Sequence, residues 1–150
     1  MMKKNPNIKQ KSVGELSPIQ YSELLSKTQL LEIYIIGFSS RIDKDKLPLG
    51  DNLSINITDN YNFTFQKDIA KASATFELNV PTTDSNETIL LIKVEYEVLM
   101  EIKENLPTEF WNIYKSVTLP IQIWPYFREF VQNTTSRMNI PPLTLPVLFK

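Results

Sequence analysis

Apolar and polar side chains alternate with a period of two through the middle of the chain, a spacing typical of β-strands with one face in water. The longest such run covers residues 88–103. Its apolar positions are Leu90, Ile92, Val94, Tyr96, Val98, Met100 and Ile102, and its charged positions are Lys93, Glu95, Glu97 and Glu101. A second run, over 70–80, alternates Ala72, Ala74, Phe76, Leu78 and Val80 with polar residues. The two runs predict neighbouring strands joined by the turn-rich segment 81–86.

Two further segments have the composition of strands. Residues 53–65 carry apolar side chains at alternate positions, among them Ile57, Tyr61 and Phe63. Residues 28–42 instead hold an almost continuous apolar run, which predicts a strand covered on both faces. Together, the four segments predict a four-stranded, mostly antiparallel sheet.

Helical signals flank the predicted sheet. Ser17 followed by Pro18 is a favourable start for a short helix over 17–27. After the last strand, Thr108 can cap another short helix. A longer helix is predicted over 119–137, where apolar residues recur at spacings of three and four.

Prolines limit the shape of the C-terminal third. Pro125 lies inside the longer helix, so that helix either begins there or bends there. Pro141, Pro142 and Pro146 require an extended segment over 140–150. With strands first and helices last, the predicted fold class is α+β, a four-stranded antiparallel sheet with two C-terminal helices packed on it.

Composition excludes several classes of function. The 150 residues fit one domain, predicted over 17–150 behind a disordered tail over 1–16. The absence of cysteine and histidine excludes disulfides, Cys/His zinc sites and Ser-His-Asp triads. The glycines, at positions 14, 37 and 50, form no phosphate-binding loop, so neither a cofactor nor a metal is expected. A net charge of −1 offers no nucleic-acid surface.

The start of the chain bears on its location. Met-Met-Lys-Lys is followed by polar residues and not by the apolar stretch of a signal peptide. The longest apolar stretch, 30–38, is too short to span a bilayer. We therefore expect a cytoplasmic protein with no membrane insertion.

The C-terminal third carries a family resemblance. The segment Trp124-Pro125-Tyr126-Phe127-Arg128-Glu129 resembles the Phe-Pro-Tyr-Ala-Arg-Glu signature of SecB export chaperones. The similarity continues through Ser136-Arg137 and resumes at Pro141-Pro142-Leu143-Thr144-Leu145-Pro146. The resemblance implies a SecB-like fold and assembly as a homotetramer, a dimer of dimers. It also implies a non-enzymatic holdase whose partners are unfolded or partly folded polypeptides.

Two departures from the family pattern bear on the client. SecB proteins continue past this point into an acidic tail that engages the SecA motor, whereas this sequence stops at Lys150. The acidity of the family is also reduced here to a charge of −1. Both departures favour a SecB-like chaperone of a toxin–antitoxin–chaperone module, which binds and protects the antitoxin. The alternative is a general export chaperone whose clients are preproteins.

Candidate binding residues are apolar side chains without an evident core partner. For client binding these are Leu47, Leu49, Leu53, Ile55, Trp124, Phe127, Leu143, Leu145, Leu148 and Phe149. Plain core packing is the competing interpretation of each. The resemblance further implies an oligomer interface along the C-terminal helices, with Phe110, Trp111, Tyr114, Tyr126, Phe130 and Met138 as its candidate residues.

A different class of function stays open at this point. Carboxylates two apart on a strand, such as Glu95 and Glu97, can hold a metal ion or act as acid and base. On this hypothesis the chain is a small-ligand carrier or a carboxylate-dependent enzyme. The competing interpretation is a solvated sheet face, and the absence of histidine, cysteine and glycine-rich loops favours it.

Overall fold

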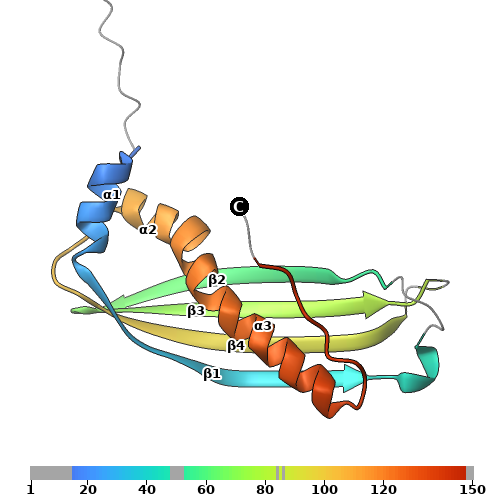
Figure 1. Cartoon of the computed structure of the whole chain (residues 1–150). Coiled ribbons are helices and arrows are strands. Elements are labelled where there is room, and N and C mark those ends of the chain that lie inside the picture. The colour runs from blue at the N-terminus through green and yellow to red at the C-terminus, as the bar shows by residue number, and fades with distance from the viewer. Residues whose placement is uncertain (1–14, 48–52, 84, 86, 148–150) are drawn as a thin grey trace, which may run out of the picture.

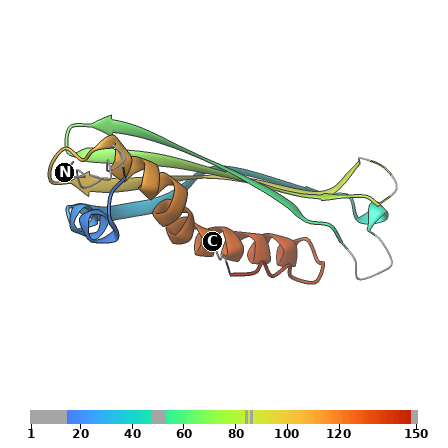
Figure 2. The same ribbon diagram turned by 90° about the horizontal axis from the view of Figure 1, so that it is seen from above.

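A computed structural model describes residues 15–47, 53–83, 85 and 87–147, which form one antiparallel sheet with helices on one of its faces (Figures 1 and 2). The strand order is β1-β4-β3-β2, where the strands are β1 Thr28–Ile42, β2 Asn56–Gln66, β3 Ile69–Pro81 and β4 Thr88–Ile102. The predicted α+β class and four-stranded antiparallel sheet are confirmed. Most of the predicted tail lies outside the described residues, and Leu16 at its end packs against the core.

The two central strands supply most of the core because alternate side chains of each strand face the helices. These side chains are almost fully buried on both strands, and in the register Ala74 pairs with Tyr96 and Phe76 with Val94. The β3–β4 hairpin closes where the Thr82 N–H donates to the Glu87 carbonyl over 2.8 Å. The alternation in the sequence therefore identifies the central core correctly.

β1 is an edge strand, and the prediction that it is covered on both faces is wrong. Leu31, Ile36 and Phe38 are 49%, 47% and 67% exposed. The register against β4 skips Leu31 and Ile36, so each of them is an extra residue inserted into the strand. Each insertion reverses which alternate positions face the helices. This reversal produces the unbroken apolar run that resembles a strand buried on both faces.

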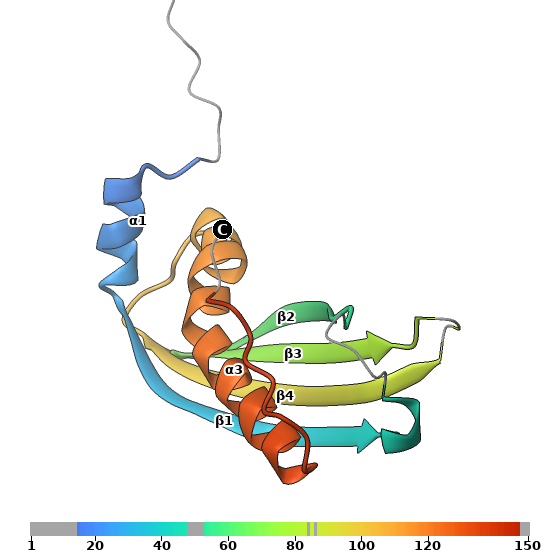
Figure 3. The same ribbon diagram turned by 45° about the vertical axis from the view of Figure 1, so that its right-hand side comes forward.

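One run of helix covers the sheet. It consists of α2 Thr108–Ile113, a π turn Tyr114–Thr118 and α3 Leu119–Arg137, and it crosses the strands obliquely from β2 to β1 (Figure 3). The two predicted C-terminal helices are therefore joined into one long helical segment. The π turn lies just before Pro120, whose ring would clash with the carbonyl four residues earlier in a regular α-helix, and the wider turn relieves that clash.

One local prediction about this helical segment is wrong, and one of the two alternatives at Pro125 is excluded. Thr108 is its first helical residue and makes no capping bond, because Pro107 occupies the cap position. Pro125 lies inside α3, so of the two predicted alternatives, a helix start or a bend, the start is excluded. The predicted apolar side of α3 does face the sheet, where the Phe127 ring stacks on Phe76 with 4.5 Å between ring centroids.

The N-terminal helix α1, Pro18–Leu25, begins as the sequence predicts. The Ser17 hydroxyl accepts from the Gln20 N–H over 3.2 Å, and the Gln20 side chain accepts from the Ser17 N–H over 2.9 Å. The Tyr21 ring stacks on Phe110, with 5.2 Å between centroids, and the Tyr21 hydroxyl is hydrogen-bonded to Thr118. α1 is thereby attached to the C-terminal helical segment.

Replacing Ser17 by alanine is expected to destabilise α1 by about 1 kcal/mol, because it removes the side-chain acceptor at the helix start. Amide hydrogen exchange over α1 measures this loss directly. Ser22→Ala is the matched control, since Ser22 is an exposed position inside the same helix. Exchange in α1 that rises equally in both variants would contradict the capping role of Ser17.

Candidate binding groove

An apolar groove lies at the end of the sheet where β1 leads into the crossover segment toward β2. Its volume is about 390 Å³. Every described residue that lines it is apolar: Ile42, Leu47, Leu53, Ile55, Val80, Ile89, Leu90, Ile140, Pro141, Pro142 and Leu143. A surface of this composition favours apolar side chains of a ligand and offers few polar groups to orient them.

The floor of the groove is rigid core. Val80 at the end of β3 and Leu90 at the start of β4 are partners in the register, and Leu90 also pairs with Ile42 of β1. Val80, Ile89 and Leu90 are 2%, 2% and 4% exposed, so their positions are fixed by packing. The groove therefore rests on the three-strand junction β1-β4-β3.

The crossover segment forms one wall. Its Leu53 and Ile55 are 41% and 36% exposed, and both lie just before β2 begins. Side chains this exposed keep apolar surface available to a ligand. The alternating apolar positions that predict a strand from residue 53 thus serve here as groove wall, because regular pairing with β3 begins only at Asn56.

Polar contacts anchor the entry to the crossover segment. The Asp43 N–H donates to the Ile89 carbonyl over 2.8 Å. Lys46 forms ion pairs with Glu87 at 2.9 Å and with Asp43 at 3.5 Å, and its pKa is raised, chiefly by the hydrogen bond to Glu87. Lys44 donates to the Asn139 carbonyl over 3.3 Å. These contacts join the start of the crossover to the β4 strand and to the end of α3.

The C-terminal segment 141–147 supplies the other wall and is held against α3 by side chains of that helix. The Trp124 Nε1–H donates to the Pro146 carbonyl over 2.9 Å, and the Arg128 Nε–H donates to the Leu145 carbonyl over 2.8 Å. Figure 1 shows this segment running back across the sheet beside α3. The arginine of the SecB-like motif therefore fastens the C-terminal segment to the helix.

The candidate client-binding residues fall into three groups. Four of them, Leu47, Leu53, Ile55 and Leu143, line the groove. Trp124, Phe127 and Leu145 are buried in the core at 9%, 0% and 3% exposure, which leaves little of their surface for a client. Leu49, Leu148 and Phe149 lie outside the described residues. Sequence reasoning missed the floor residues Val80, Ile89 and Leu90, although the predicted 81–86 hairpin already brings their strands together.

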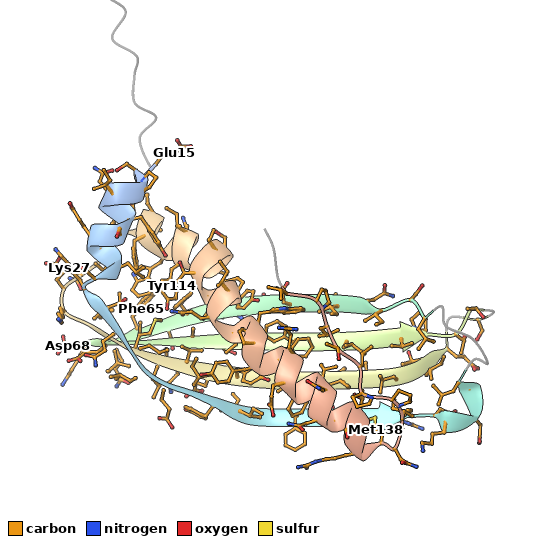
Figure 4. All side chains as sticks on the ribbon, viewed as in Figure 1. Glu15, Lys27, Phe65, Asp68, Tyr114 and Met138 are labelled. Atoms are coloured by element: carbon orange, nitrogen blue, oxygen red, sulfur yellow. The ribbon has the colours of Figure 1, made fainter. Side chains whose placement is uncertain are left out.

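The candidate interface residues also separate by burial. Phe110 and Tyr114 are 0% and 1% exposed and belong to the core of this chain. Trp111, Phe130 and Met138 are partly buried against that core, whereas Tyr126 is 47% exposed. Tyr114 and Met138 lie toward opposite ends of the molecule (Figure 4). Tyr126 and the partly buried residues are thus the ones with surface left for a partner.

The motif residues Glu129, Ser136 and Arg137 lie on the outer and β1-facing sides of α3. Glu129 accepts a hydrogen bond from the Asn133 side chain, and Ser136 is exposed. Glu129 and Arg137 line a second cavity of about 590 Å³ between α3 and the end of β1. That cavity is larger than the groove, but its walls mix charged and apolar side chains, so it is less suited to an apolar segment.

The carboxylates of β4 lie on the opposite, polar face of the sheet. Glu97 pairs with Lys71 at 3.2 Å and accepts a hydrogen bond from the Tyr34 hydroxyl, and Glu95 accepts from Ser73 over 3.0 Å. The Tyr34 hydroxyl holds the pKa of Glu97 below its usual value, whereas a general acid at neutral pH requires a raised pKa. Among the described residues, no three Asp, Glu, Cys or His side chains gather as a metal site.

Comparisons with known proteins agree with this fold. A family model described as preprotein translocase subunit SecB matches residues 51–150. The protein-export protein SecB of Methylobacillus flagellatus is 32% identical over 74 residues, which cover 49% of this chain and 46% of that protein. The match thus spans about half the length of this curated relative.

A solved structure has the same fold over most of its length. It is the SecB-like chaperone Rv1957 of Mycobacterium tuberculosis, in complex with a ChAD peptide from the Rv1956 HigA1 antitoxin. The TM-score is 0.72 at 17% identity, over 85% of this chain and 96% of that chain. At this identity the likeness establishes the fold alone.

The family assignment rests on the matched region. The match over 51–150 includes more than half of the chain, and it contains three of the four strands and the whole C-terminal helical segment. Within the described ranges, no helix combines the length and the apolar character that a bilayer crossing needs. The chain therefore belongs to the SecB family, whose members are chaperones and not enzymes.

Proposed function

We propose that this chain is an ATP-independent cytoplasmic holdase, which binds extended apolar segments of unfolded or partly folded polypeptides in its groove. The observation that carries the proposal is the wholly apolar lining of the groove, with Leu53 and Ile55 left partly exposed. Burial of client side chains there stabilises the complex by roughly 25 cal/mol per Å² of apolar surface. A groove of this kind selects for apolar character and not for a particular sequence.

An antitoxin is the client that we propose within this function. The similar fold of the mycobacterial SecB-like chaperone, solved with an antitoxin peptide, supports this choice. The net charge of −1 also offers little attraction for a basic export motor. The second candidate is a preprotein client, supported by the family description and by the export function of the curated relative. A toxin–antitoxin pair encoded beside this chain would favour the first candidate.

The same proposal includes assembly as a homotetramer, a dimer of dimers. Support comes from β1, a long edge strand on which Leu30, Ile35 and Phe38 are 43%, 40% and 67% exposed. Large apolar side chains on an unpaired edge are a liability in a monomer and are commonly covered by a partner. Tyr126 of α3 adds a further exposed aromatic ring.

Light scattering tests the proposed function. The purified chain is expected to have a mass near that of four chains, and this mass is expected to increase when a reduced, unfolded model polypeptide is added. The folded form of the same polypeptide is the control and is expected to leave the mass unchanged. A monomer that ignores the unfolded polypeptide and leaves it to aggregate would contradict both the assembly and the holdase function.

A further inference from the structure

Thr135 of α3 is the fully buried polar side chain of this helix, at 0% exposure. Its hydroxyl lies 2.8 Å from the Val131 carbonyl, to which it donates, and accepts from the Leu143 N–H over 2.9 Å. A hydroxyl has one proton to donate and lone pairs to accept with, so both of its capacities are used. Thr135 therefore joins α3 to the C-terminal segment that forms a groove wall.

The C-terminal segment needs such a contact because of its prolines. Pro141 and Pro142 have no N–H, so the first backbone donor after them is the N–H of Leu143. Prolines also hold the residues before them in extended conformations. They set the shape of the segment in this way, but they do not fix its position along α3. The hydrogen bond from Leu143 to Thr135 fixes that position at the groove.

The position of the C-terminal segment along α3 decides which of its side chains face the groove and which face the core. Leu143 is partly buried and lines the groove, Leu145 is 3% exposed, and Thr144 between them is exposed. This alternation is that of an extended chain, in which a shift by one residue would exchange the two sides. Arg128 and Trp124 bind the far end of the segment, at Leu145 and Pro146, whereas Thr135 binds the end beside the groove.

We infer that Thr135 is a positioning residue for the groove, which fixes Leu143 in the groove wall without itself touching a client. The inference rests on the proposed function, because it adds the hydrogen bond between Thr135 and Leu143 to the apolar lining as a determinant of the affinity of the groove for a client. It predicts that the hydroxyl acts through Leu143 and through no other contact with the ligand.

The test compares Thr135→Val, which keeps the shape but loses the hydroxyl, with Thr135→Ser, which keeps the hydroxyl. The probe is a fluorescein-labelled, extended apolar peptide, and the readout is fluorescence anisotropy. Thr135→Val is expected to weaken binding by roughly fivefold to tenfold, the scale of one lost hydrogen bond, and Thr135→Ser to bind like the unmodified chain. Ser136→Ala, at the exposed neighbouring position, is the matched control and is expected to change nothing.

A double-mutant comparison separates positioning from a general loss of stability. In a Leu143→Ala background, Thr135→Val is expected to weaken peptide binding by less than about twofold, because the residue through which it acts is already truncated. Amide exchange at Leu143 is expected to accelerate in Thr135→Val and to stay slow in Thr135→Ser. If Thr135→Val does not fold, Thr135→Cys replaces it, since sulfur is a weak acceptor at similar size.

The possible results are distinguishable. The positioning role would be overturned if Thr135→Val left the affinity for the peptide unchanged, or if it lowered that affinity equally in the Leu143 and the Leu143→Ala backgrounds. Peptide binding by the unmodified chain would still uphold the proposed function. Failure of the unmodified chain to bind the peptide would overturn the proposed function, and the positioning role with it. In that case, slow amide exchange at Leu143 in Thr135→Ser would show that the hydrogen bond between Leu143 and residue 135 has a structural role only.

Discussion

Replacing Leu53 and Ile55 together by aspartate is expected to lower the affinity of this chain for an extended apolar peptide by on the order of a hundredfold. Each side chain forms part of the groove wall and is exposed enough to contact a ligand. Full burial of a leucine or isoleucine contributes roughly 1.5–3 kcal/mol, and a client can bury only the exposed part of these two side chains, about two-fifths of each, so the loss of both contacts costs about 1–2 kcal/mol. The new carboxylates add a further penalty, because an apolar client would desolvate them.

The matched control places the same charges in the same segment. Ser54 and Asn56 alternate with the two groove residues, are exposed, and do not line the groove. Ser54→Asp/Asn56→Asp is therefore expected to bind the peptide within about threefold of the unmodified chain, about 0.7 kcal/mol. Fluorescence anisotropy measures both variants, and urea unfolding checks that each is folded. Equal losses in the two variants would show that charge, and not the apolar wall, controls binding.

Replacing Phe127 by alanine is expected to lower the free energy of unfolding by about 3–5 kcal/mol. The Phe127 side chain is 0% exposed, and its ring stacks on Phe76, with 4.5 Å between centroids and 14° between planes. Trp124 also contacts it, with 5.6 Å between centroids. Truncation thus leaves a cavity between α3 and the sheet, where the side chains of both layers are fully buried and closely packed. Equilibrium unfolding in urea measures the change.

Phe65→Ala is the control for Phe127→Ala. Phe65 is also an aromatic side chain in contact with other rings, but it is 52% exposed on β2. Its truncation is expected to cost less than about 1.5 kcal/mol, because much of its apolar surface is in water already. Similar losses in the two variants would mean that α3 is not packed on β3 as described.

The sequence predicts the strands well where the alternation of apolar and polar residues has a single structural cause. In β3 and β4, the alternation arises only from one buried and one wet face, and the strands follow it almost to their ends. In β1, two inserted residues and an exposed edge produce the same apolar run as a buried strand. Spacing alone does not distinguish these two causes, because the inserted residues become visible only when the pairing of β1 with β4 is known.

The candidate client-binding residues separate into groove and core for a similar reason. Leu53 and Ile55 are candidates in the sequence because they are apolar residues without an evident core partner. Trp124 and Phe127 are apolar as well, but they lie on the side of α3 that faces the sheet and are therefore buried. The wall at Leu143 depends on hydrogen bonds that α3 makes with residues 8 to 22 positions further along the chain. Such contacts leave no periodic signal in a sequence.

The strand order β1-β4-β3-β2 has a consequence for how the chain reaches its native state. β2, β3 and β4 are joined by short hairpins, so their pairing closes small loops and is entropically cheap. β1 pairs only with β4, the last strand to be synthesised, and must wait for it. We therefore expect the nucleus to form in the β2–β4 meander, with β1 docking late. The groove, which needs the end of β1, is then completed only in the last stage of folding.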